Sequence, residues 1–370
     1  MFVVRCVSVG EGGEERRGSR DEQGGRHARR PTSHRLRSRI PYPAPVSRHS
    51  LTSTPALTTT LAGISLRNPV LLAAGTAGYV DEMAGAMDLS RVGGVVTKSI
   101  TAESREGNQT WRIIETPRGM LNAIGLANIG AERFAAEHAP RAGEALATVI
   151  GSIAGDSPES YLEVARMFEN AEHIPAVELN VSCPNVHSGT HFGDDPGALR
   201  ELVQAVRPAL ATTKLFVKLS PIPGGPPGFT IVDLARAAIE AGADGLCIAN
   251  TVPAMAVDVQ TRKPRLANVT GGLSGPSVHP IAVRLVHLVH QGVARETGTP
   301  IVGVGGVMSW QDAAEFILVG ASAVQMGAAL FADPRSPLAV VKGLEAWVKR
   351  QGASNIGELV GAVELPGGRA

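Results

Sequence analysis

Residues 176–185 read Ala-Val-Glu-Leu-Asn-Val-Ser-Cys-Pro-Asn, and the pattern in this stretch decides the fold. An apolar, strand-like run passes into an amide and a thiol, and Pro184 then stops the strand. The periodicity of an amphipathic helix follows over residues 196–210. A strand with polar residues at its C-terminal end, followed by a helix, is the repeating unit of an α/β protein.

The same unit recurs along most of the chain. Strands are predicted at residues 70–75, 94–99, 148–154, 176–183, 215–220, 245–250, 301–305 and 323–326. Helices are predicted between several of them, at residues 158–169, 196–210, 231–241, 280–297 and 310–319. Eight such units favour a (β/α)8 TIM barrel over an open doubly wound sheet. The first strand also lacks the GxGxxG turn of a dinucleotide-binding domain.

Two segments precede the predicted barrel. Thr59–Leu61 and Ile64–Leu66 flank Ala62-Gly63 and predict an N-terminal β-hairpin. Residues 1–56 are rich in Arg, Gly and Pro, which predicts a disordered tail and assigns residues 57–370 to the barrel domain. Acidic residues in the tail argue against a transit peptide, and the scarcity of aromatics argues against a nucleic-acid-binding arm. We interpret the tail as dispensable, or as an over-extended start of the coding region.

Composition excludes several classes of protein. Residues 1–50 hold 11 Arg and 5 acidic residues, which leaves 24 basic and 29 acidic residues in the remainder, so the body gives no support for nucleic-acid binding. The three cysteines, Cys6, Cys183 and Cys247, show no CxxC spacing, so neither a disulfide framework nor a metal site is encoded. That pattern fits a reducing compartment and predicts a cytoplasmic protein. No apolar run reaches 18 residues, so no membrane span is expected.

The C-terminal ends of the strands in a TIM barrel face one shared pocket, so the residues there are the candidate site. These ends carry Ala74, Lys98, Ser99, Ser152, Asn180, Cys183, Lys218, Ala249, Asn250, Thr251, Gly305, Gly306, Gly327 and Ala328. Glycines at the last two ends are typical of a phosphate-binding position, although a single Gly-Gly pair is more often a plain turn.

The polar residues of this set indicate a particular kind of chemistry. Lys98 and Lys218 interrupt apolar strands; a lysine there usually extends to the rim, but two in one pocket favour cations set against a developing anion, such as a reduced flavin. The amides of Asn122, Asn180 and Asn250 offer the donors and acceptors that a planar imide ring requires. An isolated cysteine is usually structural, yet the polar neighbours of Cys183 favour proton or nucleophile chemistry.

These residues together resemble the class 1 dihydroorotate dehydrogenases. The resemblance covers about residues 58–365. Its motifs are Leu61-Ala62-Gly63, Asn68-Pro69-Val70, Ala74-Gly75-Thr76, Thr97-Lys98-Ser99, Asn122-Ala123-Ile124-Gly125-Leu126, residues 178–185, Val217-Lys218-Leu219-Ser220-Pro221, Asn250-Thr251, Gly271-Gly272-Leu273-Ser274-Gly275 and Gly303-Val304-Gly305-Gly306. No single motif is specific, but their combination in this order is.

The resemblance implies FMN at the mouth of the barrel and oxidation of (S)-dihydroorotate to orotate in de novo pyrimidine biosynthesis. By the family pattern, Cys183 is the base that removes the C5 proton, while the C6 hydride passes to FMN. The pyrimidine would contact Lys98, Asn122, Ala123, Ile124, Gly125, Leu126, Asn180, Asn250 and Thr251. FMN would contact Ala74, Lys98, Ser99, Ser152, Asn180, Lys218, Ala249, Gly275, Gly305, Gly306, Gly327 and Ala328, with Lys218 near the pyrimidine edge of the flavin.

The resemblance also implies a subgroup. Membrane-linked class 2 enzymes use serine where this chain has Cys183, so class 1 fits better. The hairpin and residues 181–186 resemble the NAD-linked class 1B catalytic subunit, which implies a homodimer core and a partner subunit with FAD and an iron–sulfur cluster. Ser152 replaces a common asparagine, Ala328 replaces a frequent threonine, and residues 187–191 depart from the usual Lys-His-Gly-Gly loop. These departures leave the electron acceptor open.

Three other functions remain open on the sequence. A tRNA-dihydrouridine synthase also combines FMN, a barrel and a Cys-Pro strand end, but the acidic body and the short segment after Phe331 disfavour it. A dihydropyrimidine dehydrogenase-type enzyme would act on a substrate without a carboxylate. A non-enzymatic binding protein would depend on the Arg-rich tail.

Overall fold

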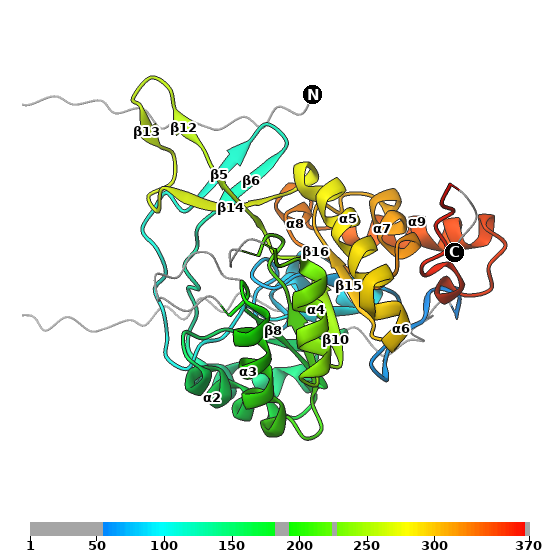
Figure 1. The fold of residues 1–370 in the computed structure, drawn as a ribbon, viewed down its shortest axis with the longest axis horizontal. Coiled ribbons are helices and arrows are strands. Elements are labelled where there is room, and N and C mark those ends of the chain that lie inside the picture. The colour runs from blue at the N-terminus through cyan, green and yellow to red at the C-terminus, as the bar shows by residue number, and fades with distance from the viewer. Residues whose placement is uncertain (1–54, 182–191, 224–227, 367–370) are drawn as a thin grey trace, which may run out of the picture. The chain divides into compact units, whose positions relative to one another are not determined.

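The computed structural model describes residues 55–181, 192–223 and 228–366. Eight parallel strands close into a barrel in chain order, and the last strand pairs with the first (Figure 1). They are β3 (Val70–Leu72), β4 (Gly94–Val96), β7 (Thr148–Ile153), β8 (Ala176–Asn180), β9 (Lys214–Lys218), β10 (Gly245–Ile248), β15 (Ile301–Val304) and β16 (Ala321–Met326). The predicted TIM barrel is therefore confirmed.

Most of the strands are shorter at their C-terminal ends than predicted. β3 ends at Leu72 rather than at residue 75, and β9 ends at Lys218 rather than at residue 220. The polar and glycine residues at these ends leave the barrel wall, as Gly75 does with a φ of +80° that few other residues adopt. The strand ends therefore become the loops that surround the mouth of the barrel.

Helices surround the barrel on its outside (Figure 1). They are α1 (Ala131–Glu137), α2 (Pro158–Glu169), α3 (Pro196–Val206), α4 (Ile231–Glu240), α5 (His279–Val289), α6 (Arg295–Thr297), α7 (Trp310–Leu318), α8 (Ala329–Ala332) and α9 (Ser336–Arg350). Ser157 and Ser309 each form a capping box at the start of α2 and α7. The predicted helix at 280–297 is α5 and α6 joined by a π-helical turn.

One of the eight strand–helix units has no α-helix. Between β3 and β4 the chain forms two short 3₁₀ turns, Glu82–Gly85 and Leu89–Arg91. The segment still covers the barrel wall, because Leu89 and Val92 pack against Leu72 and Val95. Two short turns therefore replace a helix here without exposing the strands.

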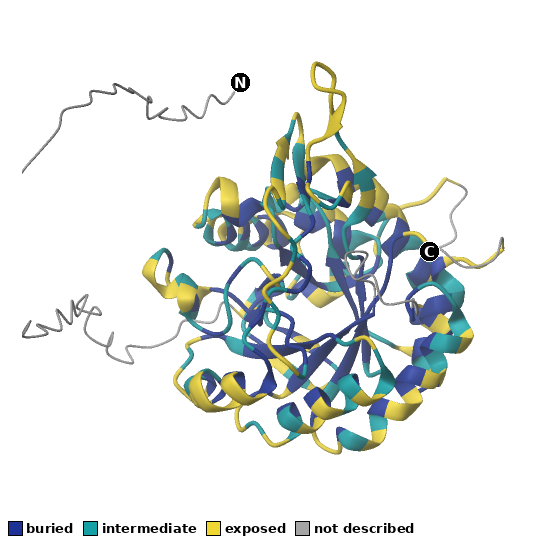
Figure 2. Cartoon of the chain, turned by 90° about the vertical axis from the view of Figure 1, so that its left-hand side faces the viewer, coloured by how far each residue is buried: buried dark blue, intermediate teal, exposed yellow. Residues whose placement is uncertain are grey.

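The alternation of side chains along each strand produces two apolar layers. On β8, Val177 and Leu179 face the surrounding helices, whereas Ala176 packs inside the barrel with Phe216 of β9 and Cys247 of β10. Figure 2 shows the result, with buried strands at the centre and exposed residues on the outer faces of the helices. The interior is a packed core rather than a channel.

The predicted hairpin is confirmed as β1 (Thr59–Leu61) and β2 (Ile64–Leu66). Leu61 and Leu66 pack against Leu71 and Val302 of the barrel interior. The hairpin thus closes the barrel at the end opposite the strand C-termini. Residues 1–54 of the predicted disordered tail lie outside the described residues, so this assignment stays a prediction.

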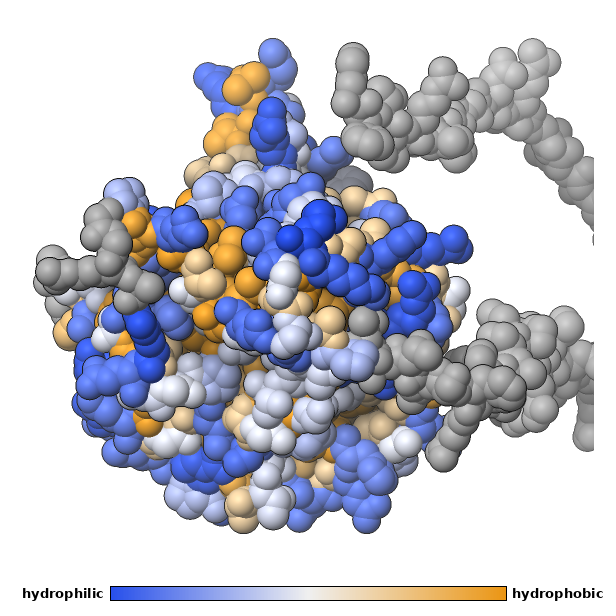
Figure 3. Space-filling model, turned by 90° about the vertical axis from the view of Figure 1, so that its right-hand side faces the viewer, coloured by the Kyte–Doolittle hydropathy of each residue, from blue (hydrophilic) through white to orange (hydrophobic). Residues whose placement is uncertain are grey.

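A four-stranded antiparallel sheet, the roof sheet, is present although the sequence patterns did not predict it. It consists of β5 (Ile113–Thr116), β6 (Gly119–Asn122), β11 (Val252–Met255) and β14 (Thr270–Ser274), in the order β11-β14-β6-β5. Its strands come from the loops after β4 and β10, which are distant in sequence. A hairpin of β12 (Val257–Asp258) and β13 (Lys263–Pro264) projects beyond it, and Figure 3 shows apolar surface there, where Val257 and Val259 are exposed.

Candidate active site

A pocket with a volume of about 200 Å³ lies at the C-terminal ends of the barrel strands. The barrel supplies its floor and walls, and the roof sheet contributes Ile113, Met120 and Leu273 from above. Most of the predicted site residues line it: Ala74, Lys98, Ser99, Asn122, Ile124, Gly125, Leu126, Asn180, Lys218, Ala249, Asn250, Thr251, Gly275, Gly305, Gly306, Gly327 and Ala328. The structure therefore brings together residues that span more than 250 positions of sequence.

Three predicted site residues are not placed in this pocket. Ala123 is buried with Leu121 and Leu266 in the small core of the roof sheet. Ser152 is fully buried, and its Oγ lies 2.9 Å from Ser99 Oγ, so it supports a lining residue rather than lining the pocket itself. Cys183 lies outside the described residues.

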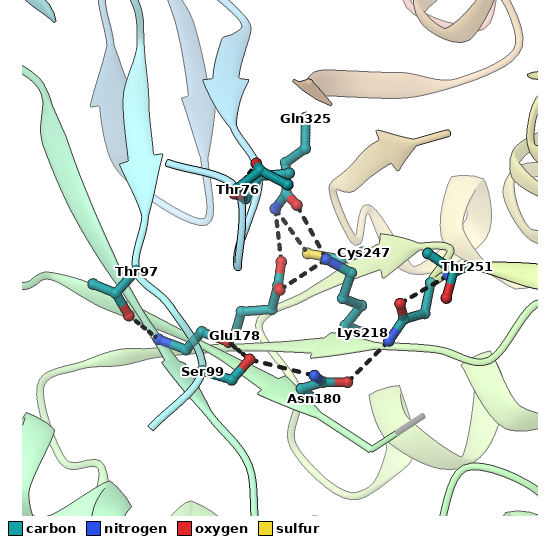
Figure 4. Close-up of polar contacts among 12 residues, drawn as sticks. Thr76, Thr97, Ser99, Glu178, Asn180, Lys218, Cys247, Thr251 and Gln325 are labelled. Carbon is teal, nitrogen blue, oxygen red and sulfur yellow. Dashed lines mark hydrogen bonds and ion pairs between the residues drawn. The ribbon is translucent and has the colours of Figure 1, made fainter. Parts of the chain in front are cut away.

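Three polar side chains contact one another at the base of the pocket and form the floor network of Glu178, Lys218 and Gln325 (Figure 4). Lys218 and Gln325 line the pocket, and Glu178 lies behind them. Lys218 Nζ donates to Glu178 Oε1 at 3.1 Å and to Gln325 Oε1 at 3.3 Å. Gln325 Nε2 donates to Glu178 Oε2 at 2.6 Å, which closes the triangle. The three residues are 0%, 6% and 2% exposed in that order, so the ion pair is buried.

The donors and acceptors of the floor network admit one arrangement. An ammonium only donates and a carboxylate only accepts, whereas the amide of Gln325 does both. Gln325 must therefore turn its oxygen to Lys218 and its nitrogen to Glu178, as it does. Because a buried charge is costly without a hydrogen-bonded partner, Glu178 allows the chain to keep the Lys218 ammonium at the base of the pocket.

Cys247 lies beside the floor network and is not a reactive thiol. Gln325 Nε2 is 3.8 Å from its Sγ. Burial raises the pKa of the Cys247 thiol well above its ordinary value, and the nearby charge of Glu178 raises it further, against the opposing influence of Lys218. The thiol is therefore kept protonated, which leaves Cys183 as the candidate base.

A second set of hydrogen bonds orients the amides of the pocket wall (Figure 4). Asn250 Nδ2 donates to Asn180 Oδ1 at 3.1 Å, and the Thr251 amide donates to Asn250 Oδ1 at 2.8 Å. Asn180 Nδ2 in turn donates to Ser99 Oγ at 3.4 Å. The direction of each bond decides which way each amide faces. The wall therefore presents polar groups in a defined orientation, as recognition of a planar heterocycle requires.

The rim holds a group of glycines, the glycine cradle of Gly275, Gly305 and Gly306. All three have positive φ, at +93°, +139° and +68°. A Cβ on Gly306 would lie 2.7 Å from the Gly275 carbonyl oxygen, so a larger residue would displace the backbone. Backbone that approaches the pocket this closely offers N–H groups to an anion.

Lys98 contributes a second cation at the wall of the pocket. A Cβ built on Gly75 would lie 4.0 Å from Lys98 Nζ, so the ammonium lies over a residue that has no side chain to obstruct it. The pocket thus combines two lysines, oriented amides and an anion-binding rim.

Comparison with known proteins assigns this pocket to a family. The family model described as Dihydroorotate dehydrogenase matches residues 56–348. The chain belongs to the dihydroorotate dehydrogenase family. Dihydroorotate dehydrogenases are flavoprotein oxidoreductases, so the pocket is that of a flavin enzyme.

Named relatives cover most of the chain. A protein of Pelobacter propionicus is 45% identical over 312 residues, 84% of this chain and 99% of its own length. A protein of Bacteroides fragilis is 42% identical over 310 residues, with 84% and 99% covered. Both are named dihydroorotate dehydrogenase B (NAD(+)), catalytic subunit. An Aquifex aeolicus protein is 44% identical over 306 residues, which are 82% of this chain and 97% of its own length. Its name is of the dihydroorotate dehydrogenase A (fumarate) type.

Several residues in or behind the pocket of this dihydroorotate dehydrogenase were not predicted from the sequence. Glu178, behind the pocket, belongs to a motif but was given no role, and Gln325, which lines it, was predicted only as part of a strand. A charged or amide residue inside an apolar barrel strand is a signal that could have identified both. Ile113, Met120, Leu273 and Phe331 also line the pocket, but nothing in the sequence links them to the barrel strands.

Within the described residues of this dihydroorotate dehydrogenase, no group of three or more His, Cys, Asp or Glu side chains could hold a metal ion. None of the helices within the same ranges is both long enough and apolar enough to cross a membrane.

Proposed function

We propose that this chain oxidises (S)-dihydroorotate to orotate in de novo pyrimidine biosynthesis and that its flavin is FMN. The observation that carries the proposal is one pocket, in a member of this family, with a buried ammonium at its floor, oriented amides on its wall and a glycine cradle at its rim. A flavin site with an adjacent pyrimidine site accounts for all three features. The alternative with specific support is a dihydropyrimidine dehydrogenase-type reaction, because the asparagines suit any pyrimidine.

The residues fit FMN in particular because the pocket has a place for each end of that molecule. The glycine cradle would hold the phosphate through backbone N–H groups, together with Gly327 and Ala328. Lys218 would lie at the pyrimidine edge of the ring system, where its charge favours the reduced form. When bound, FMN supplies the acceptor for a hydride.

The remaining residues act on the substrate. Lys98, Asn122, Asn180 and Asn250 would bind and orient dihydroorotate, with Gly125, Leu126 and Thr251 beside them. Cys183 Sγ accepts the proton from C5 of the substrate. The electron pair left at C5 would form the C5–C6 double bond as the hydrogen on C6 departs with its bonding pair. The substrate thus loses one proton and one hydride, and orotate is the product.

Dihydroorotate is expected to bleach the flavin of the purified protein under anaerobic conditions, whereas dihydrouracil is expected to leave it oxidised. Of the two compounds, only dihydroorotate carries a carboxylate, and Lys98 in the pocket can form an ion pair with it. Flavin absorbance in a stopped-flow spectrometer measures both reactions. Equal bleaching by dihydrouracil would support the dihydropyrimidine dehydrogenase-type alternative, and no bleaching by dihydroorotate would refute the proposal.

The same reduced protein tests where the electrons go. We infer that they pass to NAD+ through a partner subunit with FAD and an iron–sulfur cluster, because two relatives bear the name NAD(+) catalytic subunit. The chain alone should then be reoxidised slowly by NAD+, fumarate or a quinone offered in turn. Rapid reoxidation by fumarate would contradict this inference and would support a fumarate-linked enzyme, the type that the name of the Aquifex aeolicus relative gives. A homodimer core, a cytoplasmic location and a dispensable tail at residues 1–56 complete the proposal.

Lys218→Ala is expected to weaken FMN binding and to slow flavin reduction by about tenfold or more, because a buried charge-assisted contact at the flavin edge is lost. Flavin content after purification and the anaerobic reduction rate measure the two effects. Lys214→Ala is the matched control, since Lys214 lies at the other end of β9 in a partly exposed pair with Asp244. Unchanged flavin content and reduction rate in Lys218→Ala would exclude this role.

A further inference from the structure

A histidine lies directly behind the glycine cradle, in a place that the proposed chemistry does not use. His279 begins α5, is 8% exposed, and packs edge-on against Phe316 with the ring planes at 87°. A Cβ on Gly306 would lie 2.7 Å from His279 Cβ and 3.0 Å from its backbone nitrogen. The start of α5 and the cradle are therefore in direct contact.

The ring of His279 connects three parts of the structure. Its Nδ1 lies 3.0 Å from the Gly305 carbonyl oxygen, and its Nε2 lies 3.2 Å from Glu315 Oε2 and 3.8 Å from Asp312 Oδ1. Both carboxylates belong to α7. Asp312 also accepts hydrogen bonds from the amides of Met308 and Ser309, just after the cradle. The ring thus ties α5, the cradle and α7 together.

The partners of the two ring nitrogens hold the ring in one orientation. A carbonyl oxygen only accepts, so Nδ1 carries the hydrogen in the contact with Gly305. Nε2 faces the Glu315 carboxylate, whose side chain is 58% exposed. The ring is therefore held between the cradle and α7, with its Nδ1–H directed at the Gly305 carbonyl.

We propose that His279 is a positioning residue that orients the glycine cradle for a phosphate, so that the chain selects FMN over riboflavin. This inference rests on the proposed FMN site. The Gly305 bond fixes the peptide that lies beside the pocket, next to the positive N-terminal end of the eleven-residue α5.

Binding of FMN and of riboflavin to the flavin-free full-length protein tests this inference, because the two ligands differ only by the phosphate. Quenching of flavin fluorescence gives both dissociation constants. His279→Leu, which removes the bond to Gly305, is expected to reduce the preference for FMN about tenfold, the scale of one lost hydrogen bond to a buried group, and to leave riboflavin binding unchanged.

Two further variants test the role of the bond to Gly305. His279→Gln keeps an N–H donor at this position and should retain part of the FMN preference. His287→Leu, the same substitution as His279→Leu but further along α5, should behave as wild type. An unchanged FMN preference in His279→Leu, or an equal loss in His287→Leu, would overturn the inference. Failure of both flavins to bind wild-type protein would instead refute the proposed function, and this inference with it.

Discussion

Cys183→Ala will retain its flavin and oxidise dihydroorotate about two to four orders of magnitude more slowly, the usual contribution of a general base. A thiol of ordinary acidity is mostly protonated at neutral pH, yet it serves as a base once water is excluded from the site. Without it, no group of the proposed mechanism accepts the C5 proton, and the C6 hydride cannot leave productively. Anaerobic stopped-flow reduction by dihydroorotate measures the step directly.

Cys247→Ala provides the control for this prediction. It removes the same side chain from a buried position beside the floor network, where the thiol is kept protonated and has no assigned role in proton transfer. Its flavin reduction should stay within a few fold of wild type. Near-wild-type turnover by Cys183→Ala would contradict the assignment of the base, and the same loss in both variants would point to a general effect of cysteine removal.

Glu178→Gln is expected to lower the free energy of unfolding by about 3–5 kcal/mol, the cost of leaving a buried charge without its partner. A glutamine at position 178 cannot accept from both Lys218 and Gln325, whichever way either amide turns. Each orientation leaves two donors facing each other at the barrel floor. Urea denaturation of the flavin-free protein measures the loss, and flavin content should fall as well because Lys218 is no longer held in place.

The double variant Glu178→Gln/Gln325→Glu is the matched rescue. It exchanges the carboxylate and the amide, so Lys218 can again donate to two oxygens while the new amide at 178 donates to the new carboxylate at 325. The number of charges, donors and acceptors is unchanged from wild type. Recovery of most of the lost stability would identify the hydrogen-bond pattern as the cause. A double variant no more stable than Glu178→Gln would contradict this account of the floor network.

The barrel itself was predictable because its information is local. Period-two and helical periodicities mark the strands and helices, and serine caps mark where α2 and α7 begin. The 3₁₀ turns between β3 and β4 were not predicted, because turns of three or four residues are too short to show a helical period. The roof sheet was missed for a different reason: β6 and β14 are short strands, and β6 pairs with β14 across about 150 residues.

Much of the pocket could be predicted because parallel strands bring their C-terminal ends to one face, whatever lies between them. From the sequence alone, that rule predicts that Lys98, Asn180, Lys218 and Asn250 lie together. It could not separate pocket-lining residues from their supports. Ser152 stands at a strand end like the others, yet it hydrogen-bonds Ser99 from behind.

Three features could be predicted from the sequence, because local periodicity or a short motif indicates each of them. They are the repeating strand–helix units, the residues at the strand ends and the resemblance to the dihydroorotate dehydrogenases. Tertiary structure alone decided which polar groups meet. Glu178 and Gln325 are 147 positions apart in the sequence, and His279 and Glu315 are 36 positions apart. A buried charge needs its partner within hydrogen-bonding distance, and only the closed barrel brings those side chains that close.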